Sequence, residues 1–377
     1  MSRLIALFFF TVHVAPFFLV KHSLGLASYL FILFILFAFL IGWYLAKVVS
    51  NRQCADYITF TKCRPLSMPL VLMAYLLIRL PIIYEILNVL FTGEFASYAL
   101  NRAKMRYSGH TMGTVYNLGT VFFICYFGLV GTHLGMSEQS KSFYVTSNQQ
   151  KNKNRLLVGL TLLFMVLIES SGLARASVLL AFVVFIANYL YAKRIDYQNI
   201  SLKKLLSFSF KVLFLLLIIF YFSAYLRLLN NDNALDILID KSYLYIVGGH
   251  EALLMWLTNS HDEIISSYGY NTFASIFKLF GVVDKQGHYA KYVESGSNIF
   301  LLYRGLLQDF GFILTSIFLI GLSFLANSGD SCMHRIPGLI SLIKASICML
   351  FFLFISPFVY TTFLVGFIFS CLLQKKI

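Results

Sequence analysis

Charged residues are scarce in this sequence. Only 12% of its 377 residues are Asp, Glu, Lys or Arg, whereas 59% are hydrophobic. Soluble domains usually carry about 25% charged residues, so water is excluded as the main solvent for this chain. Aromatic residues are plentiful instead, with 39 Phe and 23 Tyr, a composition that suits lipid-facing surfaces and interfacial belts. The composition therefore predicts an integral membrane protein.

Acidic residues are the scarcer of the two charged classes. The chain has 16 acidic and 30 basic residues and a net charge of +14. In a soluble protein this excess would suggest nucleic acid as a partner. The sequence contains no nucleic-acid-binding motif, and most of the basic residues lie in short loops between apolar runs. The excess is therefore interpreted as a membrane-topology signal, and a nucleic-acid partner is not expected.

Cysteine is also infrequent, with six residues in the chain. None of them lies between residues 227 and 310, the longest polar region, which excludes disulfides and a cysteine-based metal site there. The first apolar run has no small-residue cleavage site after it, so it is expected to remain as a membrane span.

Apolar runs bounded by charges predict about ten transmembrane helices, at roughly 20 residues for each span. The expected spans are residues 4–20, 24–46, 67–91, 113–134, 157–173, 176–192, 207–226, 311–327, 338–356 and 357–373. The pairs 157–192 and 338–373 are tight enough to be hairpins or re-entrant elements instead. We expect an all-α, polytopic fold in which residues 1–377 form a single transmembrane domain.

The distribution of Lys and Arg predicts the orientation. If the spans alternate, 16 of the 30 basic residues fall in the termini and short loops of one side. Positive residues concentrate in cytoplasmic loops, so both termini are expected in the cytoplasm. Residues 227–310 then form a large loop on the opposite side, with nine acidic and six basic residues. Its short apolar stretches are expected to lie on the membrane or to cap a cavity.

Two arginines on the predicted outer side lie next to predicted spans. Arg175 lies in a short break with small neighbours, Ser170 to Gly172, and Arg227 opens the large loop. An arginine stays charged and its fork matches phosphate oxygens, so both are candidates to hold a phosphate or diphosphate. Each could alternatively be an anchor at the membrane interface.

Arg102 and Arg106 lie four residues apart in a short outer loop, which runs against the positive-inside trend. On a helix they would share one face and could bind an anionic headgroup or diphosphate. The alternative is a solvated face. Within a predicted span, Arg79 precedes Pro81 and is a candidate to line a pathway, because an ionisable residue at membrane depth is costly.

His250 and Glu251 follow two glycines in the large loop. A histidine beside a carboxylate can act as a general base near neutral pH, although a lone loop histidine often has no role. His261 offers a similar but more polar cluster. The spacing matches no compact metal motif, so no metal site is expected. Polar residues near the eighth span could bind carbohydrate or could simply end a loop; they are Asn298, Tyr303, Arg304, Gln308 and Asp309.

Several of these segments carry a family resemblance. The segments are Ser170 to Ala176, Tyr268 to Phe273, Asn298 to Phe300, Arg304, and Asp309 to Ile313 with its Asp-Phe-Gly element. Together they resemble the bacterial oligosaccharide repeat-unit polymerases, the Wzy-type O-antigen polymerases. The resemblance covers the topology of nearly the whole chain and, as local patterns, residues 169 to 325. Leu173 and Ala174 depart from the small or polar residues expected before the arginine.

The resemblance implies an enzyme of polysaccharide and lipopolysaccharide biosynthesis in the bacterial inner membrane, with its site on the periplasmic side. Such polymerases are all-helical glycosyltransferases of the membrane C type. They transfer the growing glycan from undecaprenyl diphosphate to the non-reducing end of the next lipid-linked unit. Neither a nucleotide sugar nor an obligatory metal is expected. A flippase and a chain-length regulator are expected partners, besides the inner-membrane lipids.

Under this interpretation Arg175 and Arg227 bind the diphosphate leaving group, where negative charge develops. His250 is the expected base at the acceptor hydroxyl, with Glu251 orienting or replacing it. The expected substrate-binding residues are Arg102, Arg106, Asn298, Tyr303, Arg304 and Asp309, of which Asp309 is also the second choice for the base.

Three alternatives remain. An O-antigen ligase shares the architecture and donor, and no sequence feature excludes it. A flippase or transporter of the lipid-linked oligosaccharide would be expected to show two related halves, which this chain lacks. A membrane acyltransferase would need a His/Arg constellation in the first spans, but His13 and His22 have no arginine or aspartate nearby.

Overall fold

The structure of the chain is a computed structural model. It describes residue 6 and residue 221 singly, and otherwise residues 9–20, 25–50, 61–63, 67–93, 114–139, 148–171, 175–193, 234–243, 247–259, 268–282, 302–327 and 361–376.

The described residues are helical apart from turns and one pair of three-residue strands. Four helices are long and apolar enough to cross a membrane: Leu26–Val49, Ser67–Thr92, Asn117–Gly135 and Leu302–Leu325. They coincide with expected spans, although the last begins nine residues before the predicted residue 311. The shorter apolar helices Phe10–Leu19, Leu156–Ser170, Ser177–Tyr189 and Thr361–Leu372 match four further predictions, with Leu156 one residue before the predicted start at 157. The expected span 338–356, and all of 207–226 except Tyr221, lie outside the described residues.

Large apolar side chains cover the outer surfaces of these helices. Phe37, Leu77, Phe91 and Ile313 are 68%, 66%, 88% and 77% exposed. Water would disfavour such surfaces, whereas lipid tails accommodate them. The fold is therefore that of a helical membrane protein, as the composition predicts. The total number of spans and their orientation remain predictions.

The chain divides into two compact units, each discontinuous in sequence. The first unit comprises Met1–Ile58 and Ile239–Leu364. It contains the short helices η1 (Phe10–Val14) and η2 (Ala15–Leu19), and the helices α2 (Leu26–Ser50), α10 (Gly249–Asn259), α11 (Ala274–Leu279) and α12 (Leu302–Asn327). Helix α9 (Ala234–Tyr243) crosses the boundary at residue 239.

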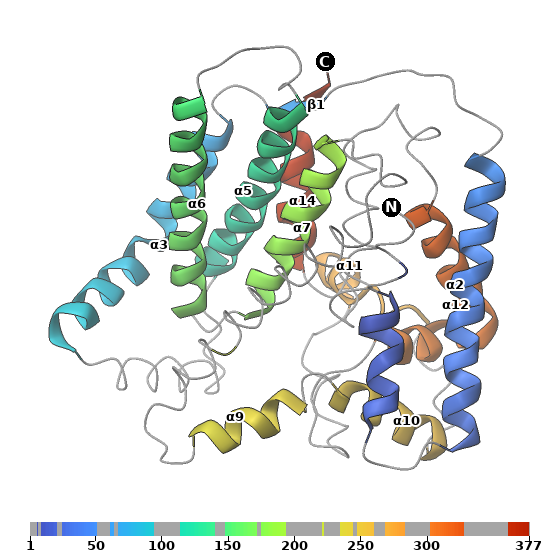
Figure 1. Cartoon of the computed structure of the whole chain (residues 1–377). Helices are drawn as coiled ribbons and strands as arrows, with labels where there is room; N and C mark the ends of the chain where they lie inside the picture. The colour runs from blue at the N-terminus through green and yellow to red at the C-terminus, as the bar shows by residue number, and fades with distance from the viewer. Residues whose placement is uncertain are drawn as a thin grey trace. The chain divides into compact units, whose positions relative to one another are not determined.

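The first unit is organised by the packing of α2 along α12 (Figure 1). The two backbones approach closely at Gly42, where an added Cβ would clash with the Ile320 carbonyl oxygen and with Ser323. The Ser323 hydroxyl donates a 2.7 Å hydrogen bond to the Phe39 carbonyl oxygen. Small residues and interhelical hydrogen bonds are the means by which helices associate in lipid.

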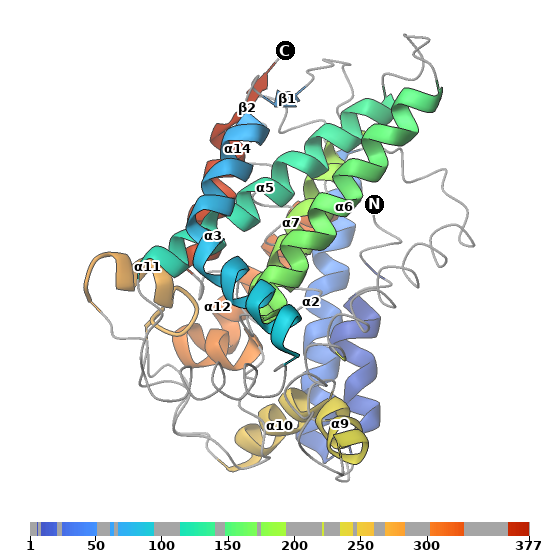
Figure 2. The same ribbon diagram turned by 90° about the vertical axis from the view of Figure 1, so that its left-hand side faces the viewer.

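The second unit comprises Thr59–Leu238 and Val365–Ile377. It contains α3 (Ser67–Thr92), α5 (Thr114–Gln139), α6 (Asn148–Ser171), α7 (Arg175–Lys193) and most of α14 (Thr361–Leu372). Helices α5, α6 and α7 lie side by side, and α5 packs most extensively on α7 (Figures 1 and 2). Helix α3 bends along its length, as Pro81 inside it leads us to expect (Figure 1).

The strands of the second unit, β1 (Thr61–Cys63) and β2 (Gln374–Lys376), pair antiparallel, with Lys62 opposite Lys375 (Figure 2). Segments that hydrogen-bond to each other must lie on one side of a membrane. Strands β1 and β2 therefore share a side.

Candidate functional site

Two segments singled out in the sequence meet at Asp309 in the first unit. One carboxylate oxygen, Oδ1, accepts a 3.1 Å hydrogen bond from the main-chain N–H of Asn271, and Oδ2 accepts one of 2.6 Å from that of Thr272. The side-chain amide of Asn271 donates to Oε1 of Gln308 at 3.1 Å. Asp309 is only 3% exposed. Its carboxylate thus anchors the Tyr268–Phe273 segment to α12.

The anchored segment has an unusual backbone. Tyr268 has φ 46° and Gly269 φ 96°, so two consecutive residues adopt positive φ. The Phe273 N–H then donates to the Gly269 carbonyl oxygen at 2.9 Å, which leads the chain into α11. A non-glycine residue at positive φ is uncommon and is held in place by its surroundings. The two bonds to Asp309 supply that restraint.

The Asp-Phe-Gly element marks a break in α12. Gly311 has φ 63° and ψ −172°, so the residues before and after it form two helical segments joined at this point. This conformation is open to glycine and strained for other residues. Phe310 packs against Phe273 with ring centroids 6.2 Å apart. Asp309, Phe310 and Gly311 thus hold a polar loop where the long apolar part of α12 begins.

Arg304 and Tyr303 lie one turn or more before this break, and both are buried. The Arg304 guanidinium lies over the Trp256 ring of α10, with Cζ 5.0 Å from the ring centroid. Arg304 is 3% exposed and Tyr303 is 2% exposed. A buried cation stacked on an aromatic ring keeps a fixed position and a full charge. Among the described residues of the first unit, Arg304 is the only arginine.

His250 and Glu251 lie in the first turn of α10, whereas the sequence prediction placed them in a loop break. The His250 ring meets Phe17 edge-on at 4.6 Å between centroids, and only 1% of the residue is exposed. Glu251 is 8% exposed. Trp256, which contacts Arg304, lies further along the same helix, α10. A base role for His250 requires that the acceptor reach a ring enclosed by aromatic side chains.

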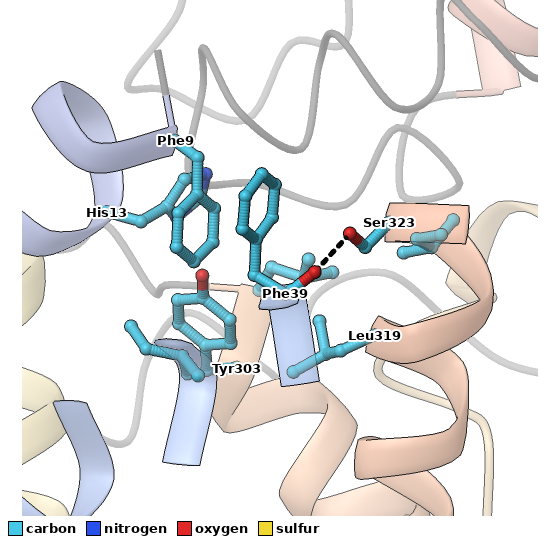
Figure 3. Close-up of a pocket in the computed structure, with 9 residues that line it drawn as sticks. Phe9, His13, Phe39, Tyr303, Leu319 and Ser323 are labelled. Atoms are coloured by element: carbon cyan, nitrogen blue, oxygen red, sulfur yellow. Dashed lines mark hydrogen bonds between the residues drawn. The ribbon is translucent and has the colours of Figure 1, made fainter. Parts of the chain in front are cut away.

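A small cavity lies between η1, α2 and α12 (Figure 3). His13, Phe9 and Tyr303 line one part of it, and Figure 3 shows the Tyr303 hydroxyl directed toward the other two rings. The His13 and Tyr303 rings are 5.4 Å apart. The cavity volume is about 20 Å³, which holds one water molecule and no sugar.

The remaining predicted residues divide into two groups. Arg102, Arg106, Arg227, Asn298 and His261 lie outside the described residues. Arg175 is the first residue of α7, in the second unit. The structure thus brings together Asp309 with the Tyr268–Phe273 segment, and Arg304 with α10. The assignments of all these residues to substrate remain predictions.

Some polar contacts were not expected from the sequence. Trp256 and Thr272 were not recognised as neighbours of Arg304 and Asp309. Glu169 in α6 forms a buried ion pair with Arg79 in α3. The sequence does contain a signal for this pair. Each residue is a charge inside an apolar run, and charged residues within membrane spans usually pair with one another.

Comparisons of the chain with protein-family models, with curated proteins and with solved structures found no match to any of them.

Proposed function

We propose that the protein is a polysaccharide repeat-unit polymerase of the bacterial inner membrane with its site on the periplasmic side. It would transfer a growing glycan from undecaprenyl diphosphate to the next lipid-linked unit. One observation supports this most. Tyr268–Phe273 and Asp309–Ile313, which carry the family resemblance, meet through both carboxylate oxygens of Asp309.

In the proposed reaction the non-reducing-end hydroxyl of the acceptor attacks the anomeric carbon of the donor. The bond from that carbon to the diphosphate oxygen breaks, and undecaprenyl diphosphate leaves with the bonding electrons. Negative charge grows on the diphosphate, so fixed cations lower the barrier. From the sequence, Arg175 and Arg227 are the expected source of this charge, and Arg304 is an expected substrate-binding residue. In the structure the Arg304 guanidinium lies over the Trp256 ring.

The acceptor hydroxyl must lose its proton as the new bond forms. His250 takes the proton, and Glu251 beside it in α10 orients the ring or replaces it. Burial of both side chains excludes water, which would otherwise compete with the acceptor hydroxyl for the donor. The chain contacts an undecaprenyl-linked oligosaccharide and acts beside a flippase and a chain-length regulator.

The test is deletion of the gene in its host, with lipopolysaccharide separated on a silver-stained gel. Plasmids encoding the wild-type protein and the Arg175→Ala variant are then supplied. A polymerase deletion collapses the ladder to core plus one repeat unit. The wild-type plasmid should restore the ladder and Arg175→Ala should not, at equal amounts of protein in the membrane.

Other outcomes would reject the proposal. Loss of all attached O-antigen, with polymer accumulating on the carrier lipid, identifies a ligase. The same loss without such polymer identifies a flippase. If the ladder is unchanged, capsule and exopolysaccharide are measured in the same strains, and normal polymer in all three rules out polymerisation.

A further inference from the structure

Arg79 and Glu169 form an ion pair in the interior of the second unit, 90 residues apart in sequence. The Arg79 Nε donates to Oε1 of Glu169 at 2.7 Å, and Nη2 lies 2.6 Å from the same oxygen. Their side chains are 1% and 0% exposed. Both residues lie inside helices that the sequence predicts to cross the membrane, and the ion pair is enclosed away from water.

The pair is part of a network that joins four helices. Arg79 Nη2 also donates to the Thr120 hydroxyl on α5 at 3.0 Å. The Tyr75 hydroxyl, one turn before Arg79 on α3, donates to the Met165 carbonyl oxygen on α6 at 3.3 Å. The Ser177 hydroxyl on α7 interacts with the Glu169 carboxylate. The network thus links α3 to α5 and α6, and α6 in turn to α7.

That level is the end of the bundle at which α7 begins. Thr120 is six residues after the first residue of α5, and Glu169 is two residues before the last residue of α6. Ser177 is two residues after Arg175, the first residue of α7. The Glu169 carboxylate therefore interacts with α3 on one side and with the first turn of α7 on the other.

Stability alone does not explain a buried ion pair. Well-packed apolar side chains at the same positions are often neutral or more stable, because burying two charges carries a desolvation penalty. Apolar contacts between helices in lipid have no preferred direction, whereas hydrogen bonds between charged groups fix distance and angle. The pair thus supplies geometric precision where α6 ends and α7 begins.

We infer that Arg79 and Glu169 are positioning residues that hold the start of α7, and with it Arg175, in place for the diphosphate. This inference rests on the proposed function. Neither residue touches the reacting atoms. Their contribution is to set the position of Arg175, since transfer is sensitive to the placement of the cation relative to the developing charge.

The test is a double-mutant cycle on the full-length protein, with kcat/KM measured for a lipid-linked repeat unit. The first variant is the apolar pair Arg79→Met with Glu169→Leu, which removes both charges and leaves neither one unpaired. The second is Arg175→Ala, and the third combines all three changes. Thr161→Val is the matched control, because Thr161 is a partly exposed residue of α6 whose hydroxyl donates to the Leu157 carbonyl oxygen of its own helix.

We expect the apolar pair to give the wild-type amount of folded protein and a kcat/KM at least tenfold lower. Adding Arg175→Ala to the apolar pair should then lower kcat/KM far less than it does in the wild-type background. A purely structural role would not produce this non-additivity. Thr161→Val should match the wild type.

The inference is overturned if the folded apolar pair polymerises at the wild-type rate, or if the two losses multiply independently. It is also overturned if the apolar pair fails to fold, because the ion pair then serves stability. Failure of the proposed function shows elsewhere, as wild-type polymer from Arg175→Ala alone or as an unchanged ladder after gene deletion.

Discussion

The Oδ2 atom of Asp309 accepts a 2.6 Å hydrogen bond from the main-chain N–H of Thr272, 37 residues away in sequence. With the bond from Asn271 to Oδ1, both carboxylate oxygens are committed to the backbone of one loop. A carboxylate used in this way is a structural anchor. We therefore expect substitution of Asp309 to lower the stability of the protein, and unfolding measurements can distinguish this effect from a loss of catalysis.

Asp309→Asn should destabilise the protein by about 2–3 kcal/mol, because hydrogen bonds to charged groups contribute about 1.5–3 kcal/mol each and the amide NH₂ would face a backbone N–H. Thermal unfolding in detergent measures the loss. Gln308→Ala removes one neutral bond to Asn271 and should cost about 1 kcal/mol. An Asp309→Asn protein as stable as the wild type but inactive would instead identify Asp309 as a catalytic base.

The fold class was predictable from the sequence because apolar runs of about 20 residues have few solutions other than membrane helices. The same argument explains why span ends were less accurate. Composition places the start of a span at residue 311, yet α12 begins at Leu302. The apolar pattern marks the residues expected to face lipid, whereas α12 begins earlier, with residues that are mostly buried against other parts of the chain.

The candidate site was predictable in parts. Residues such as Arg304 and Asp309 stand out as polar groups among apolar ones, but their partners do not. Trp256 is 48 positions from Arg304 and resembles any other interfacial aromatic residue in sequence. Thr272 bonds to Asp309 through its main-chain N–H, and every residue except proline has this donor, so the sequence does not reveal the contact.

A second prediction concerns the break in α12. Gly311→Ala should destabilise the protein by about 1–3 kcal/mol, because φ 63° with ψ −172° is strained for any residue with a Cβ. Gly321→Ala is the matched control in the same helix, since nothing lies within 4 Å of the added Cβ. Alanine there should be neutral or stabilising by up to about 1 kcal/mol. Equal unfolding temperatures for the two variants would contradict a break at Gly311.

A third prediction concerns the space beside the buried ion pair. A Cβ added at Gly119 would lie 2.7 Å from Cζ and 2.8 Å from Nη1 of Arg79. The guanidinium cannot move aside without disturbing its bonds to Glu169 and Thr120. Gly119→Ala should therefore cost about 1–3 kcal/mol, as other overpacking substitutions do.

Gly159→Ala is the comparison for this third prediction. Gly159 lies in α6 and has nothing within 4 Å of the added Cβ. Both variants are compared by thermal unfolding in the same detergent. If Gly119→Ala unfolds no earlier than Gly159→Ala, the guanidinium is not confined as the structure places it.

The last prediction concerns His250, whose ring packs edge-on against Phe17. His250→Leu keeps an apolar side chain of similar size in this buried position, so the protein should fold. General-base catalysis contributes roughly 10²–10⁴-fold to a rate, and the polymerisation rate should fall by that factor.

His133→Leu is the control, because His133 is an exposed residue of α5. Both are measured as polymer formed per unit time from a lipid-linked repeat unit, at equal amounts of folded protein. A wild-type rate for folded His250→Leu would show that His250 is not the base and would leave Glu251 as the candidate. The rate of Glu251→Gln would then decide whether α10 supplies a base at all.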